Sequence, residues 1–129
     1  MNAPSYPLAA AVVRDVLAQR LPGVTSYVTV PRDHPDRYVH VVSRGGTRRR
    51  HGHLSDRMLQ IYGYGPTAGV AADLCERAVT AIVGAGMDPS EQRIRRCTVA
   101  GEPADYSDPD SGSPRATATV VVLLRGATF

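Results

Sequence analysis

The sequence predicts one small α+β domain in which two helices cover one face of a mixed, mostly antiparallel sheet. Two segments repeat apolar residues at three- and four-residue spacing, which is typical of amphipathic helices. Five other segments alternate apolar and polar residues or are rich in β-branched residues, which is typical of strands. The predicted order is α-β-β-β-α-β-β, and 129 residues suffice for one hydrophobic core.

The first helix is expected over residues 8–21. Pro7 suits its first turn, and Pro22-Gly23 ends it. One apolar stripe runs along it, formed by Leu8, Val12, Val13, Val16, Leu17 and Leu21. A helix with a single stripe of this kind covers a sheet on one side only.

Three strands are expected to follow, over residues 24–30, 38–44 and 54–64. A loop with two prolines separates the first two strands, and Gly45-Gly46 predicts a turn after the second. The segment 47–53 is polar and basic. The second and third strands therefore predict a hairpin with a long basic tip.

The second helix is expected to run from Gly65-Pro66-Thr67 to about Val83, with Gly84 and Gly86 as C-terminal caps. Its predicted buried stripe consists of Val70, Ala71, Leu74, Cys75, Ala78, Val79 and Ile82. The face opposite this stripe is polar. Both helices therefore have one apolar side each, as two helices on the same face of a sheet require.

The last two strands are expected over residues 93–99 and 116–124. A loop over residues 101–114, with three prolines and four acidic residues, joins them. The final strand is the most apolar in the chain. We therefore expect it to be central in the sheet.

Composition places the chain among ordinary folded proteins, with 43% apolar and 21% charged residues. It contains no run of about 18 apolar residues, and the apolar stretch 8–13 is too short for a secretory signal. We expect synthesis in a cytoplasm and no membrane partner.

Glycines at the start of the second predicted helix raise the possibility of nucleotide binding. Gly63-x-Gly65-x-x-Ala68 follows a predicted strand and opens a helix, as the pyrophosphate-binding turn of dinucleotide-binding proteins does. Pro66 removes a backbone donor from this turn, and the strand before it belongs to a hairpin rather than a βαβ unit. We favour the alternative, a tight strand-to-helix turn that needs glycine.

No residue pattern identifies a metal site or a catalytic centre. His51 and His53 would place two imidazoles on one side of a strand, but the sequence positions no third ligand. The acidic segment 102–110 lacks the glycine and glutamate spacing of an EF-hand. The chain has no Gly-x-Ser-x-Gly motif and no lysine for a P-loop. We expect no cofactor, no metal, no catalytic residue, and separate thiols at Cys75 and Cys97.

Charge is concentrated in two segments. Residues 44–57 contain five arginines and one aspartate, a net charge of +4, although the whole chain carries only +3. Residues 102–110 carry −4 and no arginine. At a hairpin tip, arginine side chains are expected to be hydrated or to contact another molecule.

These two segments supply the candidate contact residues: Arg48, Arg49, Arg50, Asp105, Asp108 and Asp110. Opposite charges on two loops suit a head-to-tail assembly in which each subunit contacts the next. Phosphate binding by the three arginines is the alternative, although no aromatic residue interleaves with them.

The C-terminal quarter resembles a known family. The stretch Gly101-Glu-Pro-Ala-Asp-Tyr-Ser-Asp-Pro-Asp-Ser-Gly-Ser-Pro-Arg115, with the strand up to Arg125-Gly126, resembles tail terminator proteins of long-tailed actinobacterial phages. Those proteins carry a similar Asp-Pro-x-Ser-Gly-x-Pro-Arg turn before a last strand. Tyr38-Val-His-Val-Val-Ser-Arg-Gly-Gly46 resembles their proline-flanked second strand. The similarity extends over residues 8–126 in order and spacing, but Tyr62-Gly-Tyr64 stands where the family often has Trp.

This resemblance implies a non-enzymatic structural protein of the virion tail. Family members form a homohexameric ring at the head-proximal end of the tail tube, which stops tube polymerisation and offers a surface to the head. The implied partners are further copies of the chain, the tail tube protein, a head–tail connector or stopper protein, and DNA passing transiently through the lumen. Two alternatives remain: another neck or connector protein, or a small nucleic-acid-binding protein that uses the arginines at 48–50.

Overall fold

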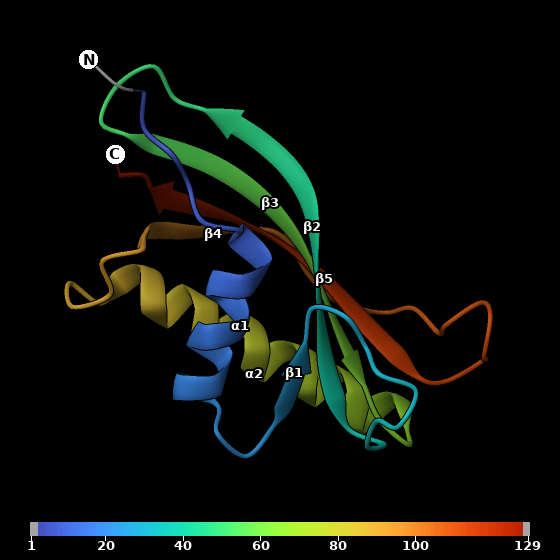
Figure 1. Ribbon diagram of the computed structural model, residues 1–129. Coiled ribbons are helices and arrows are strands. Elements are labelled where there is room, and N and C mark those ends of the chain that lie inside the picture. Colours follow the sequence, from blue (N-terminus) through green and yellow to red (C-terminus); the bar gives the residue numbers. More distant parts are fainter. Residues whose placement is uncertain (1–2, 128–129) are drawn as a thin grey trace.

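A five-stranded sheet carries both helices on one face in the computed structural model, which describes residues 3–127 (Figure 1). The elements are α1 (Ala9–Arg20), β1 (Thr25–Tyr27), β2 (Tyr38–Arg48), β3 (Leu54–Tyr64), α2 (Ala68–Met87), β4 (Ile94–Asp105) and β5 (Arg115–Arg125). The strand order is β1-β2-β3-β5-β4, and only the β1–β2 pair is parallel. The predicted α+β class, element order and mostly antiparallel sheet are confirmed.

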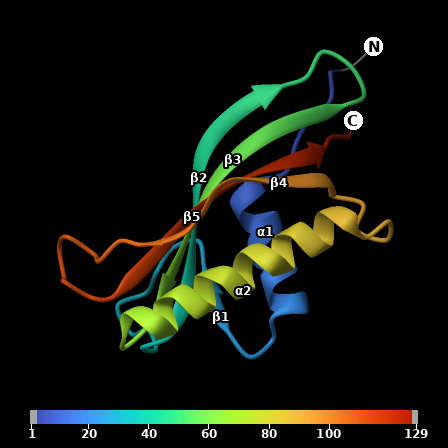
Figure 2. The ribbon, with the colours of Figure 1, turned by 180° about the vertical axis from the view of Figure 1, so that it is seen from behind.

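The two helices lie side by side beneath the sheet and leave its other face open (Figures 1 and 2). Alternation along the strands explains this. On β3, Leu59 and Ile61 are fully buried against the helices, whereas Met58 on the opposite face is 41% exposed. β5 adds Val120 and Val122 to the same core. Burying side chains of this size contributes about 1.5–3 kcal/mol each, so one covered face can stabilise the domain.

The strand-to-helix turn is tight, and glycine is what allows it. A Cβ added to Gly63 would lie 2.5 Å from the carbonyl oxygen of Ala71 and 2.7 Å from the amide nitrogen of Cys75. The Oγ1 of Thr67 then caps α2 by accepting a hydrogen bond from the Val70 amide at 3.2 Å. The glycines therefore let β3 approach the helix backbone, which supports the packing interpretation over a nucleotide site.

The hairpin differs from the prediction at Gly45-Gly46. We expected a turn there, but β2 continues to Arg48, and the register shifts between Ser43 and Gly46. Gly45 has φ +85°, and a Cβ on Gly46 would overlap the carbonyl of Asp56. The two glycines form a β-bulge rather than a reversal. The reversal follows it, where Gly52 and His53 both have positive φ.

The first strand is shorter than predicted. Residues 24–30 alternate well, yet only Thr25–Tyr27 pairs, and it runs parallel to β2. Val28 is 39% exposed, because the chain leaves the sheet there to cross back before β2. Two parallel strands need a crossover connection between them. The sequence pattern alone does not distinguish a parallel from an antiparallel pair.

The second helix is longer than predicted. It continues to Met87, so Gly84 and Gly86 lie within it and are not caps; Asp88 is the C-cap residue. A Cβ on Gly86 would lie 2.6 Å from the amide nitrogen of Cys97. This glycine therefore allows the end of α2 to pack closely on β4.

β4 is also longer than predicted, since it runs through residues 100–105 and reduces the expected loop 101–114 to residues 106–114. Three register shifts occur along it, between Ile94 and Arg96, Val99 and Gly101, and Gly101 and Ala104. β5 is internal, between β3 and β4, while β3 is the middle strand. Leu8, expected in the helical stripe, is the N-cap residue of α1 and is 79% exposed.

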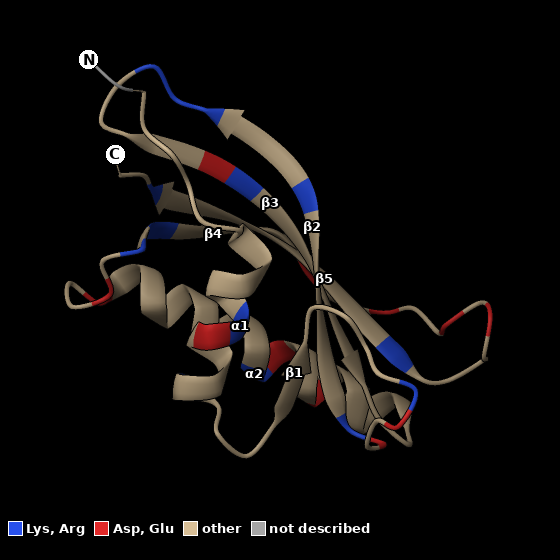
Figure 3. Cartoon of the chain, in the orientation of Figure 1, with Lys and Arg blue, Asp and Glu red and all other residues tan. Residues whose placement is uncertain are grey.

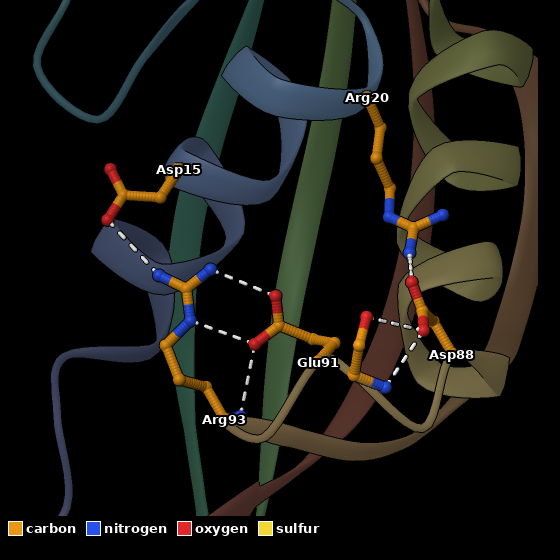
Figure 4. A network of polar contacts seen from close by, with 6 residues as sticks. Asp15, Arg20, Asp88, Glu91 and Arg93 are labelled. Carbon is orange, nitrogen blue, oxygen red and sulfur yellow. Dashed lines mark hydrogen bonds and ion pairs between the residues drawn. The ribbon is translucent and has the colours of Figure 1, made fainter.

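A polar network joins α1 to the α2–β4 connection (Figure 4). Arg93 binds Glu91 through two side-chain hydrogen bonds of 2.9 Å each and reaches Asp15 of α1 at 3.3 Å. Arg20 pairs with Asp88, whose other carboxylate oxygen accepts hydrogen bonds from Ser90. The bonds from Arg93 hold the pKa of Glu91 below its usual value. These contacts fix α1 relative to the end of α2.

Cys75 is buried and Cys97 partly buried, and both are free thiols, as expected. Burial raises the pKa of the Cys75 thiol to about 12 and that of Cys97 to about 11. Within residues 3–127, neither helix is long and apolar enough to cross a membrane.

Candidate functional site

The two charged segments lie at opposite ends of the sheet (Figure 3). β3 pairs with β5 over its full length, from Leu54 opposite Arg125 to Tyr64 opposite Arg115. The basic hairpin tip adjoins the first of these pairs, and the acidic loop 106–114 adjoins the second. Eleven residues of strand separate them by about 35 Å. One copy therefore cannot bring its own two charged segments together.

The hairpin tip and the N-terminal segment enclose a basic groove of about 460 Å³. Its lining residues are Ala3, Pro4, Tyr6, Arg48, Arg49, Arg50 and His53. An isolated bridge between Ser5 and Ala127 holds the N-terminal segment beside the end of β5. The structure therefore brings the three predicted arginines together around one concave surface.

Two of these three arginines have partners within the chain, contrary to the expectation from sequence. Arg49 donates two hydrogen bonds to Asp56, at 2.8 and 3.1 Å, and these bonds lower the pKa of that carboxyl. Arg48 donates to the carbonyl of Pro4 at 3.2 Å and lies over the ring of Tyr6 at 5.0 Å. Among the described residues, Arg50 has no hydrogen-bonding or ion-pair partner. The groove thus retains the charges of Arg48 and Arg50, because only Arg49 is neutralised by a carboxylate.

Tyr6 organises one wall of this groove. Its ring lies beneath two guanidinium groups, those of Arg48 at 5.0 Å and Arg57 at 5.4 Å. A Cβ on Gly126 would lie 2.8 Å from the same ring, so the ring also packs on the end of β5. One aromatic side chain therefore joins the N-terminal segment, the hairpin and the C-terminal strand.

The acidic loop folds on itself by local hydrogen bonds. The Asp108 carboxylate accepts from the Asp110 amide at 2.9 Å, and the Gly112 amide donates to the Asp108 carbonyl at 2.7 Å. The bond from the Asp110 amide is the main cause that lowers the pKa of Asp108. Within residues 3–127, no hydrogen bond or ion pair engages the carboxylates of Asp105 and Asp110. Of the three predicted acidic contact residues, Asp108 therefore has a local structural role.

Arg115 attaches this loop to the open face of the sheet, a feature the sequence analysis missed. Its guanidinium lies 4.6 Å from the ring centroid of Tyr62, 5.9 Å from that of Tyr64 and 5.0 Å from that of Tyr106. It also donates to the Tyr64 hydroxyl and to the Tyr106 carbonyl. The spacing of Tyr62 and Tyr64 on one strand indicates a shared face, but nothing local in sequence predicts Arg115 above them.

A second concave surface, the tyrosine pocket, lies at this acidic end. It measures about 260 Å³ and is lined by His34, Asp36, Tyr38, Tyr64, Gly65, Pro66, Ser113 and Pro114. The rings of Tyr38 and Tyr64 stack nearly parallel, with centroids 4.5 Å apart. Burial raises the pKa of the Tyr38 hydroxyl to about 12.

Residues 3–127 contain no group of three His, Cys, Asp or Glu side chains arranged to hold a metal ion. Burial lowers the pKa of His40, and one nitrogen of its ring lies 3.1 Å from the Val28 carbonyl oxygen. His53 lines the basic groove at the hairpin reversal.

No protein-family model matches the sequence, and no curated protein matches it. Solved structures do match the fold. One is a chain of the virion of a native gene transfer agent particle, with a TM-score of 0.59 and 14% sequence identity. The alignment covers 92% of this chain and 95% of that chain. At this identity the likeness shows a shared fold over nearly the whole of both chains.

Proposed function

We propose that this chain is a structural protein of a phage-like virion. The observation that carries the proposal is the near-complete structural overlap with a chain of a gene transfer agent virion. Overlap of 92% and 95% leaves little of either chain outside the shared fold. The virion role is taken from that protein and from the sequence resemblance, since fold alone does not define function.

Within the virion, the proposed role is that of a tail terminator. Copies form a homohexameric ring on the head-proximal end of the tail tube, end its polymerisation and join it to the head-side connector or stopper protein. The resemblance of residues 101–126 to the tail terminator family supplies this finer role. DNA passes through the lumen of the ring, and no catalytic step is part of the function.

The charge distribution supports a ring built head to tail. The basic groove and the acidic loop occupy opposite ends of β3 and β5, so one end of each copy can meet the other end of the next (Figure 3). A heterologous contact of this kind closes into a ring when its rotation permits. Exposed ion pairs give about 0.2–1 kcal/mol each, a modest contribution that every interface of the ring repeats.

The test is assembly on tail tubes. Purified protein is added to tubes formed by the tail tube protein, and the ends are imaged by electron microscopy. The expected result is a sixfold ring on one end and an arrest of further tube growth. Sedimentation of the protein without tubes serves as a control for ring formation in solution. Symmetry other than sixfold or threefold on the tube end would contradict the proposal.

The basic groove favours nucleic-acid binding as a second candidate, because Arg48 and Arg50 keep uncompensated charge on a concave surface. This function predicts retention on DNA that weakens steeply with salt, since each phosphate contact releases counterions. Replacing both arginines with Gln should abolish retention if the groove binds phosphate. A wild-type protein that passes through a DNA column at low salt excludes this candidate.

A further inference from the structure

The tyrosine pocket has the chemistry of a site for a cationic side chain. Tyr38 and Tyr64, which stack on each other and are mostly buried, line it together with the exposed residue Asp36. A guanidinium pairs with a carboxylate through two parallel hydrogen bonds, so an arginine of another molecule suits a pocket of this kind. Within residues 3–127, no hydrogen bond or ion pair engages Asp36. The pocket therefore lacks a cation of its own chain against Asp36.

Asp108 is not the carboxylate that would pair with such a cation, although it lies near the same rings. Its carboxylate is committed to the Asp110 amide and to the Tyr64 hydroxyl at 3.5 Å. Arg115 is also committed, because its guanidinium donates to the Tyr64 hydroxyl and the Tyr106 carbonyl. Asp36 comes from the loop before β2, a segment that the charge pattern of the sequence did not single out.

The basic groove contains an arginine that could pair with Asp36 of another copy. The chain has no lysine, so a second copy can offer only arginine or its N-terminus. Of the three arginines in the basic groove, Arg50 alone lacks an intramolecular partner among the described residues. It lies at the β3 end opposite the tyrosine pocket, about 35 Å away. Its own pocket is out of reach, whereas the pocket of the next copy in a head-to-tail ring is not.

We propose that Arg50 of one copy enters the tyrosine pocket of the next copy, where its guanidinium pairs with Asp36. This contact rests on the proposed ring and specifies its interface. It assigns the acceptor to Asp36 rather than to the aspartates of the acidic loop. Those aspartates supply the surrounding negative field.

Charge exchange between copies tests the pairing. Arg50→Glu places a carboxylate against Asp36, and Asp36→Arg places a guanidinium against Arg50, so each variant alone creates a like-charge contact at every interface. In an equimolar mixture, an alternating ring has opposite charges at every interface. Both side chains are exposed, so circular dichroism should show folded protein in each case. Matched controls are Arg95→Glu on β4 and Asp33→Arg on the same loop as Asp36.

Ring formation is measured by sedimentation and on tail-tube ends. Each variant alone should raise the concentration needed for half-assembly at least tenfold, the mixture should restore it to near the wild-type value, and the two controls should leave it unchanged. Rings that form normally from either single variant overturn the Arg50–Asp36 contact but leave the ring intact. Failure of the mixture to recover overturns the contact as well. A wild-type chain that never forms rings, alone or on tubes, refutes the proposed function and this contact together.

Discussion

The two ends of the sheet are held by the same residue types in opposite proportions. At the basic end, one tyrosine ring, Tyr6, lies beneath two guanidinium groups. At the acidic end, one guanidinium, that of Arg115, lies against three tyrosine rings. Both arrangements attach a segment that lies outside the regular sheet: the N-terminal segment in one case and the loop 106–114 in the other.

This difference in proportions determines the sign of the net charge at each end of the sheet. Two arginines on one ring concentrate positive charge, whereas one arginine among three rings leaves the nearby carboxylates in excess. Stacking on aromatic rings leaves the charge of a guanidinium intact, in contrast to an ion pair such as Arg49 with Asp56. The polarity of the molecule thus follows from the local packing at each end as well as from the count of charged residues.

The largest effect is expected for Arg115→Ala. This change removes contacts with three rings and two hydrogen bonds from a half-buried cation, which should lower the free energy of unfolding by about 2–3 kcal/mol. Urea unfolding measures the loss, and hydrogen exchange should rise in residues 106–114. The control Arg95→Ala changes an exposed arginine and should be nearly neutral. Equal effects of the two changes would show that the tyrosine cluster does not hold the loop.

A smaller effect is expected for Tyr6→Ala, which should cost about 1–2 kcal/mol, because the ring is lost from beneath the guanidinium groups of the exposed Arg48 and the partly buried Arg57. Cleavage by a protease near the N-terminus should become faster. Tyr6→Phe keeps the ring and should behave as the wild type in both measurements. If Phe is as damaging as Ala, the hydroxyl rather than the ring carries the interaction.

The smallest effect is expected for Asp56→Asn at the basic end. The pKa of Asp56 is lowered by its hydrogen bonds from Arg49, so its contribution to stability is complete above the unfolded-state pKa near 4. That contribution is lost as the pH falls through the lower folded-state pKa. The difference between wild type and variant should therefore shrink in acid, and also in high salt, because the pair is largely exposed. A difference that is constant from pH 7 to pH 2 would contradict the ion pair.

Sequence alone predicted the layers of the fold, because the two apolar stripes and the alternation of Leu59 and Ile61 depend only on local periodicity. It misplaced boundaries where a glycine serves packing between elements. Gly45-Gly46 indicated a turn but forms a bulge, and Gly86 indicated a cap but lies against β4. Glycine suits turns, bulges, helix caps and close packing alike, and only the tertiary neighbour of each glycine shows which of these it serves.

For the candidate contact residues, too, sequence predicted the local features but not the tertiary contacts. Sequence located the basic and acidic segments, since charge runs are visible without structure. It did not reveal that Arg48 stacks on Tyr6 or that Arg49 binds Asp56, so it treated three arginines as equivalent. Asp36 was missed for a related reason, because its pocket is formed by loops that are distant in sequence. Pairings of this kind depend on topology rather than on spacing.

The register shifts along the two edges of the sheet affect whether further strands can be added to it. β2 is covered by β1 only at Tyr38–His40, and the rest of its outer edge carries the bulge between Ser43 and Gly46. β4 forms the other edge and is interrupted three times. A twisted, irregular edge is a poor template for a further strand. Copies crowded together at high concentration are thus discouraged from adding strand to strand into open-ended fibrils.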